Sequence, residues 1–317
     1  MDSLKVSVIV PTRNRPEILG RCLESIIQSH CNYAYHELMV VDSSDDEAKI
    51  RLTRQIAQDM GVLYYQEPGP GLSFARNTGI RSSSGDIVVF ADDDFVVEKD
   101  WIYNLVPNYA DEQVICCTGR MLPYRQDEAS TVFAQTMGYD RGDRRRIFTV
   151  DDISLVKLFK TVPLIGRLRL ADKTPVPWGV GTGFCSFRKR VFEEVGYFDE
   201  NLRVGRVSVG EDMDMFYRIL KSRYKIIYEP RAVVNHDDPQ TMEGILNKSY
   251  NYGLHRQVVF SKYRKDPYML ALCFGSFFFS MLALLRTTMK SEREERKVIA
   301  AGIKGFLEGL GKKRLRI

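Results

Sequence analysis

The sequence IVVFADDDF at residues 87–95 decides the fold of this chain. Its first four residues are apolar and mostly β-branched, which predicts a strand buried on both faces. The run ends abruptly in the three carboxylates of Asp92, Asp93 and Asp94. Adjacent carboxylates repel one another, so their placement after a buried strand favours a divalent cation bound to their oxygens. A simple acidic turn before the next helix is the alternative interpretation.

The segments before this stretch repeat one pattern, in which a short apolar strand is followed by a polar loop and an amphipathic helix. Strands are expected at residues 5–10, 37–41 and 62–65. This alternation predicts a parallel sheet with helices on both faces. Ligands bind such sheets at the carboxyl ends of the strands, where this sequence places its polar and acidic residues.

The composition is that of a globular protein in a reducing compartment. Hydrophobic residues make up 44% of the 317 residues, which is ample for a sizeable core. The six cysteines show no paired Cys-x-x-Cys spacing, so neither a zinc site nor a disulfide framework is predicted. The first apolar run, at residues 6–10, is too short for a signal-peptide core, so the catalytic part is expected in the cytoplasm.

The positive charge is concentrated at the end of the chain. Residues 286–317 hold ten Lys and Arg and four Glu, a net charge of +6, whereas the whole chain carries +5. The preceding residues therefore carry −1. This distribution argues against a nucleic-acid-binding body and favours a tail attracted to an anionic surface.

Residues 268–285 form an apolar segment without a charge. As a helix it would be about 27 Å long, the threshold for crossing a bilayer. Basic residues flank both ends, including Arg264, Lys265, Arg286 and Lys290, which does not favour a crossing. We expect a helix that lies in or dips into the cytoplasmic leaflet. The alternatives are packing on the catalytic part and packing in a homo-oligomer interface.

The loop at residues 66–73, QEPGPGLS, lacks the spacing of either phosphate-loop fingerprint, so a Rossmann or Walker site is not predicted. A helix is expected to open after this loop, and it carries Arg76. This arginine could act as a fixed cation for a diphosphate or as an organiser of neighbouring carboxylates.

Gly210 precedes a helical pattern, which places Glu211 and Asp212 in the first turn of a helix. Negative charge is favourable at this position. A carboxylate held there can also serve as a general base. Both interpretations stay open on the sequence alone.

Two further strands are expected at residues 225–228 and 232–234, separated by a turn at residues 229–231. His236 follows the second of these strands. A histidine at a strand exit is a candidate metal ligand that would complete a site with Asp94.

Together these segments resemble the successive motifs of the family 2 glycosyltransferases. They occur in the family's order and at family-like separations between residue 6 and about residue 236. The matching segments are VSVIVPTRNR at 6–15, VVD at 40–42, ARNTG at 75–79, FADDD at 90–94, WGVGTGFCSFRK at 178–189, VGYFDE at 195–200 and GEDMDM at 210–215.

The resemblance implies the α/β architecture of the GT-A fold. In this fold a mostly parallel central sheet is flanked by helices and divides into a Rossmann-like nucleotide-binding half and an acceptor-binding half. The implied catalytic domain spans residues 1–238, with the nucleotide-sugar half at about 1–120 and the acceptor half at about 121–238. Residues 239–317 are then a C-terminal helical, membrane-associating segment.

The resemblance also implies the reaction, which is metal-dependent transfer of a sugar, with inversion, from a nucleotide-diphosphate sugar to an acceptor hydroxyl. Such a reaction would serve the synthesis of a cell-surface polysaccharide or glycolipid. The implied cofactor is Mg²⁺ or Mn²⁺, held by Asp94, Asp92 and His236. Both Asp-x-Asp and Asp-Asp registers fit the acidic triplet, so Asp92 and Asp93 are also candidates for donor binding, one of them at the ribose.

The remaining donor-binding residues follow from the same likeness. Asp42 matches the position that hydrogen-bonds the nucleotide base, and Arg76 matches the arginine beside it. Pro11, Thr12 and Arg13 would line the same pocket.

On the acceptor side, Trp178, Gly181, Thr182 and Gly183 belong to the segment that resembles the family's acceptor-binding part. The implied general base is Asp212, with Glu211 orienting the acceptor or neighbouring loops. Asp214 is the second choice for the base.

The expected partners are a nucleotide-diphosphate sugar, a glycan or lipid-linked acceptor, and the inner face of the cell membrane; a homo-oligomer is possible and no nucleic acid is expected. A polyprenyl-phosphate glycosyltransferase is an alternative within the family. A nucleotidyltransferase would share the metal and the sheet but would leave the Glu-Asp helix start without a role. A non-catalytic binding protein would lack catalytic residues, and none is missing from the motifs.

Overall fold

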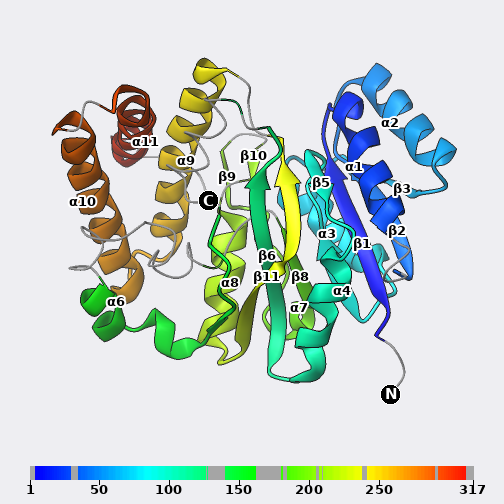
Figure 1. The fold of residues 1–317 in the computed structure, drawn as a ribbon, viewed down its shortest axis with the longest axis horizontal. Coiled ribbons are helices and arrows are strands. Elements are labelled where there is room, and N and C mark those ends of the chain that lie inside the picture. The colour runs from blue at the N-terminus through cyan, green and yellow to red at the C-terminus, as the bar shows by residue number, and fades with distance from the viewer. Residues whose placement is uncertain are drawn as a thin grey trace.

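The computed structural model describes residues 4–29, 35–125, 127, 140–161, 180, 184–204, 207–208, 210–237, 241–289 and 292–311. They form an α/β fold in which helices flank a central sheet, as predicted (Figure 1). Among the described residues, the sheet has nine strands in the order β3-β2-β1-β4-β8-β6-β11-β5, with β7 beside β11. These strands are β1 Val6–Thr12, β2 Glu37–Asp42, β3 Leu63–Gln66, β4 Ile87–Phe90, β5 Phe95–Val97, β6 Val114–Pro123, β7 Arg146–Phe148, β8 Cys185–Arg188 and β11 Lys225–His236; β9 Arg203–Val204 and β10 Val207–Ser208 form a separate hairpin.

The parallel arrangement predicted from the sequence is found in the N-terminal half of the sheet. There β1 pairs in parallel with both β2 and β4, and β2 pairs in parallel with β3. In the second half, β8 runs antiparallel to both of its neighbours, while β6 and β11 are parallel to each other. The carboxyl ends of β1, β2 and β4 therefore meet at one edge of the sheet.

The strand β4 is buried on both faces, as its apolar run predicts. Ile87 and Val89 belong to one hydrophobic cluster, and Val88 and Phe90 belong to the other. Because successive side chains of a strand point to opposite faces, these two clusters are the cores on the two sides of the sheet. All four side chains are fully buried.

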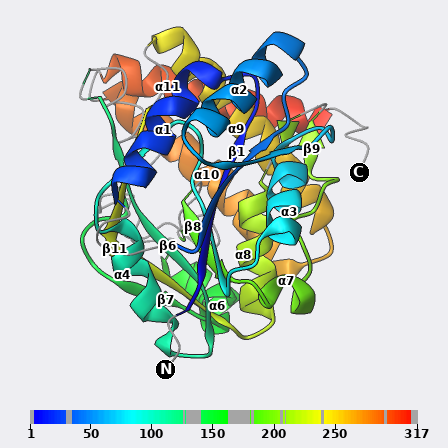
Figure 2. The same ribbon diagram turned by 90° about the vertical axis from the view of Figure 1, so that its right-hand side faces the viewer.

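Helices cover both cores. The helix α1 packs on the side of Ile87 and Val89, and α3 and α8 pack on the side of Val88 and Phe90. Figure 1 shows α1 and α2 at one end of the sheet and α9, α10 and α11 at the other, and Figure 2 views the molecule from the side of α1 and α2. The helices are α1 Pro16–Ser29, α2 Glu47–Asp59, α3 Leu72–Ser82, α4 Trp101–Leu105, α6 Leu155–Thr161, α7 Val191–Glu194, α8 Glu211–Lys221, α9 Met242–Lys262, α10 Pro267–Met289 and α11 Arg293–Gly311, with short 3₁₀ turns η1 at Val106–Ala110 and η2 at Val150–Ile153.

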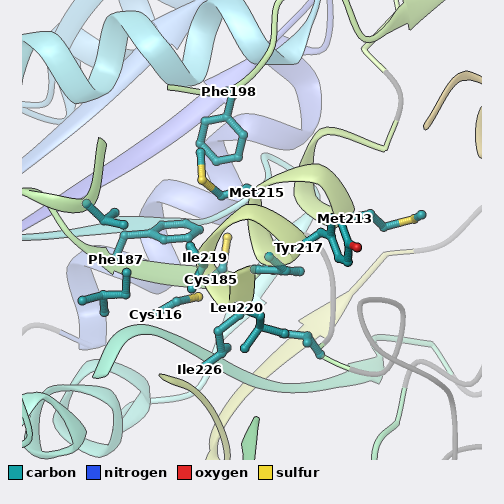
Figure 3. Packing of buried hydrophobic residues seen from close by; sticks show 14 of the residues in the cluster. Cys116, Cys185, Phe187, Phe198, Met213, Met215, Tyr217, Ile219, Leu220 and Ile226 are labelled. Atoms are coloured by element: carbon teal, nitrogen blue, oxygen red, sulfur yellow. The ribbon is translucent and has the colours of Figure 1, made fainter. Parts of the chain in front are cut away.

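The helix α8 packs deeply against the sheet. Its residues Met215, Phe216, Ile219 and Leu220 are fully buried. Figure 3 shows α8 side chains packed among residues of β6, β8 and β11, such as Phe187. Helix α8 is thus fixed against the sheet, and the position of its first turn is fixed with it.

The prediction of two strands around a turn at residues 229–231 is wrong. Strand β11 runs without a break from Lys225 to His236. Its register with β6 shifts between Glu229, which pairs with Gly119, and Val233, which pairs with Arg120. Residues 230–232 thus interrupt the regular ladder, which accommodates Pro230 because proline has no N–H to donate. The strand then continues as far as β5, where His236 pairs with Phe95.

The last three helices pack on the rest of the fold and on one another. Val259 and Phe260 of α9 and Phe306 of α11 belong to the same core cluster as α8. A Cβ on Gly305 would lie 1.9 Å from the carbonyl oxygen of Tyr250, so α9 and α11 approach backbone to backbone. The boundary at residues 238 and 239 stays a prediction, since the tail shares a core with the rest.

Within the described residues, α10 is the one helix long and apolar enough to cross a membrane. Its mean hydropathy is 2.0 over the most apolar window, of which 17% is buried.

Candidate active site

The acidic triplet lies where β1 and β4 end side by side. Ala91 donates its backbone N–H to the carbonyl of Ile9 at 3.1 Å, which continues the ladder past the end of β4. The hydroxyl of Thr12, the last residue of β1, donates to Asp93 Oδ2 at 2.6 Å. Asp93 is fully buried. The polar loop after the first strand and the triplet after the fourth are therefore parts of one site.

Arg15 contacts two carboxylates of the triplet. Its guanidinium lies 2.5 Å from Asp93 Oδ1 and 3.1 Å from Asp94 Oδ2. The Arg15 side chain is 50% exposed. A cation reached from solvent therefore neutralises this side of the site.

Arg76 joins the triplet to the start of α8. Its side chain is 1% exposed, and its Nη1 lies 2.5 Å from Asp212 Oδ1 and 3.1 Å from Glu211 Oε1. Its Nη2 lies 3.4 Å from Asp92 Oδ1. The guanidinium carbon also lies 5.5 Å from the centre of the Phe90 ring. The geometry supports the interpretation of Arg76 as an organiser of carboxylates.

Burial changes the titration of this cluster. It raises the pKa of Asp92, Asp93 and Glu211 above the ordinary range of a carboxyl group, because desolvation of the charged forms outweighs the nearby arginines. The pKa of Arg76 is raised although burial lowers it, because Asp212 and then Asp92 stabilise the charged guanidinium. Arg76 thus keeps its charge, whereas burial disfavours the charged forms of Asp92 and Glu211.

Asp94 and His236 are two of the three predicted metal ligands, and they lie close to each other. Asp94 Oδ1 is buried, the described residues offer it no hydrogen bond, and it lies 3.6 Å from His236 Nε2. Two ligands on one ion with bonds of about 2.1 Å would lie about 3 Å apart, so a small adjustment accommodates Mg²⁺ or Mn²⁺. Asp92, the third candidate, is directed at Arg76. No cluster of three or more possible metal ligands occurs in the part of the chain that the structure describes.

The predicted nucleotide pocket lies along the ends of β1 and β2. Thr12 pairs with Asp42 across the two strands, and Pro11 precedes Thr12 in β1. Asp42 is fully buried, and the Tyr64 hydroxyl donates to its Oδ2 at 3.0 Å. Arg13 faces Asp45 at 2.8 Å in the same loop region. In the structure the hydroxyl of Tyr64 contacts Asp42, and three other carboxylates contact Arg76.

Asp212 and Asp214, both in the first turn of α8, differ in their exposure and in their partners. The side chain of Asp212 is 12% exposed, and it faces Arg76. Asp214 is fully buried, and it is held by Arg218 at 2.8 Å, Lys262 at 2.5 Å and the Tyr263 hydroxyl at 2.6 Å. Asp214 is thus enclosed by cationic and hydroxyl donors, which makes it a poor candidate for the base.

Trp178, Gly181, Thr182 and Gly183, the predicted acceptor-side residues, lie outside the described residues. Val180, which lies between Trp178 and Gly181 in the sequence, is described and buried. Its carbonyl accepts a hydrogen bond from the Thr118 hydroxyl at 2.7 Å. Val180 is therefore bonded to β6.

The sequence interpretation gave no role to several residues that the structure brings to the site. Arg15 and Tyr64 are two of them, and Asp237 is a third, which is bonded by Arg21 and, at 3.0 Å, by Arg125. The position of Asp237 directly after a candidate metal ligand was the available signal. For Arg15 and Tyr64 only the fold identifies the partner.

A family model described as glycosyl transferase family 2 matches residues 7–196. The glycosyltransferase GlyA of Streptococcus pneumoniae is 26% identical over 226 residues, which is 71% of this chain and 29% of GlyA. This chain thus spans less than a third of that relative's length. The glucosyl-dolichyl phosphate glucuronosyltransferase of Haloferax volcanii is 31% identical over 240 residues, which is 74% of this chain and 69% of that protein.

Among solved structures, the mannosyltransferase PcManGT of Pyrobaculum calidifontis, in complex with GDP-Man and Mn²⁺, superposes with a TM-score of 0.62. The match covers 98% of this chain and 88% of that one at 19% identity, so it shows a shared fold. That fold includes the region of the last three helices.

Proposed function

The chain belongs to glycosyl transferase family 2, and from this we propose that it transfers a sugar, with inversion, from a nucleotide-diphosphate sugar to an acceptor hydroxyl. The observation that carries the proposal is that the buried guanidinium of Arg76 contacts both Asp92 and Asp212. A donor-binding carboxylate and a candidate base, 120 residues apart in the chain, are thereby held in one cluster.

On the donor side, Asp42 at the end of β2 would bind the nucleotide base, with Pro11, Thr12 and Arg13 lining the pocket. Asp92 or Asp93 would bind the ribose. Asp94 and His236 would hold Mg²⁺ or Mn²⁺, which when bound neutralises charge on the diphosphate leaving group. The complex of PcManGT with GDP-Man and Mn²⁺ supports this assignment of donor and metal.

On the acceptor side, Asp212 would accept the proton of the acceptor hydroxyl. The hydroxyl oxygen forms the new bond to the anomeric carbon while the bond from that carbon to the diphosphate oxygen breaks, and the electron pair leaves with the nucleoside diphosphate. The contact with Arg76 Nη1 at 2.5 Å fixes the direction of the Asp212 carboxylate. Glu211 would orient the acceptor together with Trp178, Gly181, Thr182 and Gly183.

The substrates would belong to the synthesis of a cell-surface polysaccharide or glycolipid, at the inner face of the cell membrane. The name of the Haloferax relative, a glucosyl-dolichyl phosphate glucuronosyltransferase, supports a lipid-linked acceptor. We assign residues 1–238 to the catalytic domain, with a donor half and an acceptor half, and residues 239–317 to a helical membrane-associating segment.

A panel of nucleotide sugars, assayed with the purified full chain, tests the reaction. Release of nucleoside diphosphate with one donor, in the presence of Mn²⁺ or Mg²⁺ and not with a chelator, is expected. Release of pyrophosphate would instead identify a nucleotidyltransferase. No release with any donor, offered together with lipid-linked acceptors, would contradict the proposal.

The base is tested by Asp212→Asn. We expect transfer to fall by about 10²–10⁴-fold, because the acceptor proton loses its acceptor, while donor affinity stays within a few-fold. Product formation and donor binding by calorimetry measure the two effects separately. Asp214→Asn is the comparison, since Asp214 is enclosed; if it alone abolished transfer with donor binding and stability intact, the roles would be reversed.

A further inference from the structure

The helix α10 has two distinct sides. Its buried residues lie on one side, and they are Tyr268, Met269, Leu272 and Thr287. At about 100° per residue, the exposed large side chains fall within about one third of the helix circumference on the other side. They are Leu270, Phe274, Phe278, Met281, Leu282, Leu285 and Met289, and we call this set the α10 stripe.

The α10 stripe is an uncovered apolar surface. Phe274 is 73% exposed and Met289 is 87% exposed. Figure 1 shows α10 at the outer side of the molecule, away from α1 and α2. A continuous row of large apolar side chains on a surface marks a site for another apolar surface.

The packing of α10 favours a helix lying on a membrane over a helix crossing it. Its first turns are anchored, because Tyr268, Met269 and Leu272 belong to the core cluster that contains α8. Residues 273–289, which follow, would span about 26 Å, less than the ~30 Å of a hydrocarbon core. The helix would therefore have to leave the core to cross a bilayer.

The positive charge near α10 favours an anionic lipid surface over a second copy of the chain as the partner of the stripe. Arg264 and Lys265 are exposed just before α10, and Lys304 on α11 is 72% exposed. Residues 286–317 carry a net charge of +6. A second copy of the chain, packed symmetrically, would place this basic segment against itself, whereas an anionic lipid surface attracts it.

Side-chain contacts join α9 and α10 to α8, whose first turn carries the candidate base Asp212. Tyr268 of α10 stacks on Tyr217 of α8, with ring centres 6.1 Å apart. Lys262, at the end of α9, contacts Asp214 at 2.5 Å, and Asp214 lies in the same turn of α8 as Asp212. A surface bound to α10 is thus held at a fixed position relative to the first turn of α8.

We propose that the α10 stripe docks the protein on an anionic lipid bilayer, as a helix in the plane of the interface, and that the acceptor is presented from this lipid surface. The docking stands independently of the reaction. The assignment of a lipid-linked acceptor rests on the proposed function, because it names the substrate of the same site.

Vesicle sedimentation tests the docking. The full chain should sediment with vesicles containing phosphatidylglycerol and much less with phosphatidylcholine alone, and added salt should weaken binding. The double variant Phe274→Ser, Phe278→Ser should bind about tenfold more weakly or worse, because it removes two large apolar side chains from the interface. Tyr103→Ser is the matched control, since Tyr103 is an aromatic residue of α4 that is 56% exposed. Equal binding by the double variant and the wild-type chain would overturn the proposal.

The alternatives give distinct results. A dimer of the wild-type chain that the double variant converts to a monomer, without vesicle binding by either, would assign the stripe to a second copy and overturn the proposal. In Phe274→Trp, the added fluorescence should be quenched more by lipids brominated near the headgroup than by those brominated at the chain end. The reverse order would indicate a crossing helix and overturn the docking in the plane of the interface.

Measuring nucleoside diphosphate release together with vesicle binding shows which of the two proposals fails. Vesicle binding without nucleoside diphosphate release from any donor would refute the proposed function and support the docking. Nucleoside diphosphate release without vesicle binding would support the proposed function and refute the docking. With both present, faster transfer to a lipid-linked acceptor in anionic vesicles than to the same glycan free in solution is expected, and equal rates would overturn the acceptor assignment.

Discussion

Arg76 and Arg15 both contact the acidic triplet, and they differ in burial. Arg76 extends from helix α3, is 1% exposed and touches three carboxylates, those of Asp92, Glu211 and Asp212. Arg15 lies in the loop before α1, is 50% exposed and touches two, those of Asp93 and Asp94.

The difference separates a fixed charge from an exchangeable one. A cation with no access to solvent cannot leave without exposing several buried carboxylates, so Arg76 is part of the framework. A half-exposed arginine can rotate into water at little cost, and another cation can replace it. Burial thus predicts which side of the triplet is structural and which side is open to a ligand.

Replacing Arg76 is expected to have the largest effect. In Arg76→Met the carboxylates keep their burial and lose their counter-charge, which should lower the free energy of unfolding by about 3–5 kcal/mol. Urea denaturation of the variant and of Arg76→Lys measures this. Lysine keeps the charge but not the fork of donors, so an intermediate loss is expected. A loss below about 1 kcal/mol in Arg76→Met would refute the framework role.

A smaller effect, which depends on pH, is expected for Glu211→Gln. Since the pKa of Glu211 is raised in the folded protein, its ionisation costs stability as pH rises from the unfolded pKa through the folded one. Glutamine does not titrate, so the variant should gain stability relative to the wild-type chain from about pH 5 to about pH 8, on the order of 1 kcal/mol. Melting temperatures across this range measure the difference. A gain that is largest at the acidic end of the range would contradict the raised pKa.

The same comparison explains how far the sequence predicted the site. The ends of β1, β2 and β4 could be predicted to meet, because strand-helix alternation specifies a parallel sheet and Asp42 and Asp92 lie at the ends of their strands. The pairing of Arg76 with Glu211 could not, because 135 residues separate them. Only the packing of α8 against the sheet brings its first turn to the arginine.

Local signals also failed where tertiary pairing was stronger. Glu229-Pro230-Arg231 is a good turn sequence, yet β11 continues through it with a shift of register because β6 supplies a partner on both sides of the shift. The role of Arg15 was missed for a similar reason. Its two partners lie 78 and 79 residues further along the chain, and nothing in its own loop points to them.

Arg15→Gln gives the smallest expected change in stability and the sharpest test of the exchangeable side. Because the pair is half-exposed, the free energy of unfolding should change by less than about 1 kcal/mol. The affinity for Mn²⁺ should rise by about 3- to 10-fold, since a cation that competes for Asp93 and Asp94 has been removed. Titration of free Mn²⁺ by electron paramagnetic resonance, without substrate, measures this.

Arg13→Gln is the matched control for that titration, because Arg13 lies in the same loop and forms an ion pair with Asp45 at 2.8 Å. It removes the same charge, so any general electrostatic gain in Mn²⁺ affinity appears in both variants. An excess gain in Arg15→Gln then measures direct competition. Equal gains in the two variants would mean that Arg15 acts only through its general positive charge. Weaker Mn²⁺ binding in Arg15→Gln would mean that Arg15 orients the carboxylates for the ion, as Arg76 orients the three carboxylates that it contacts.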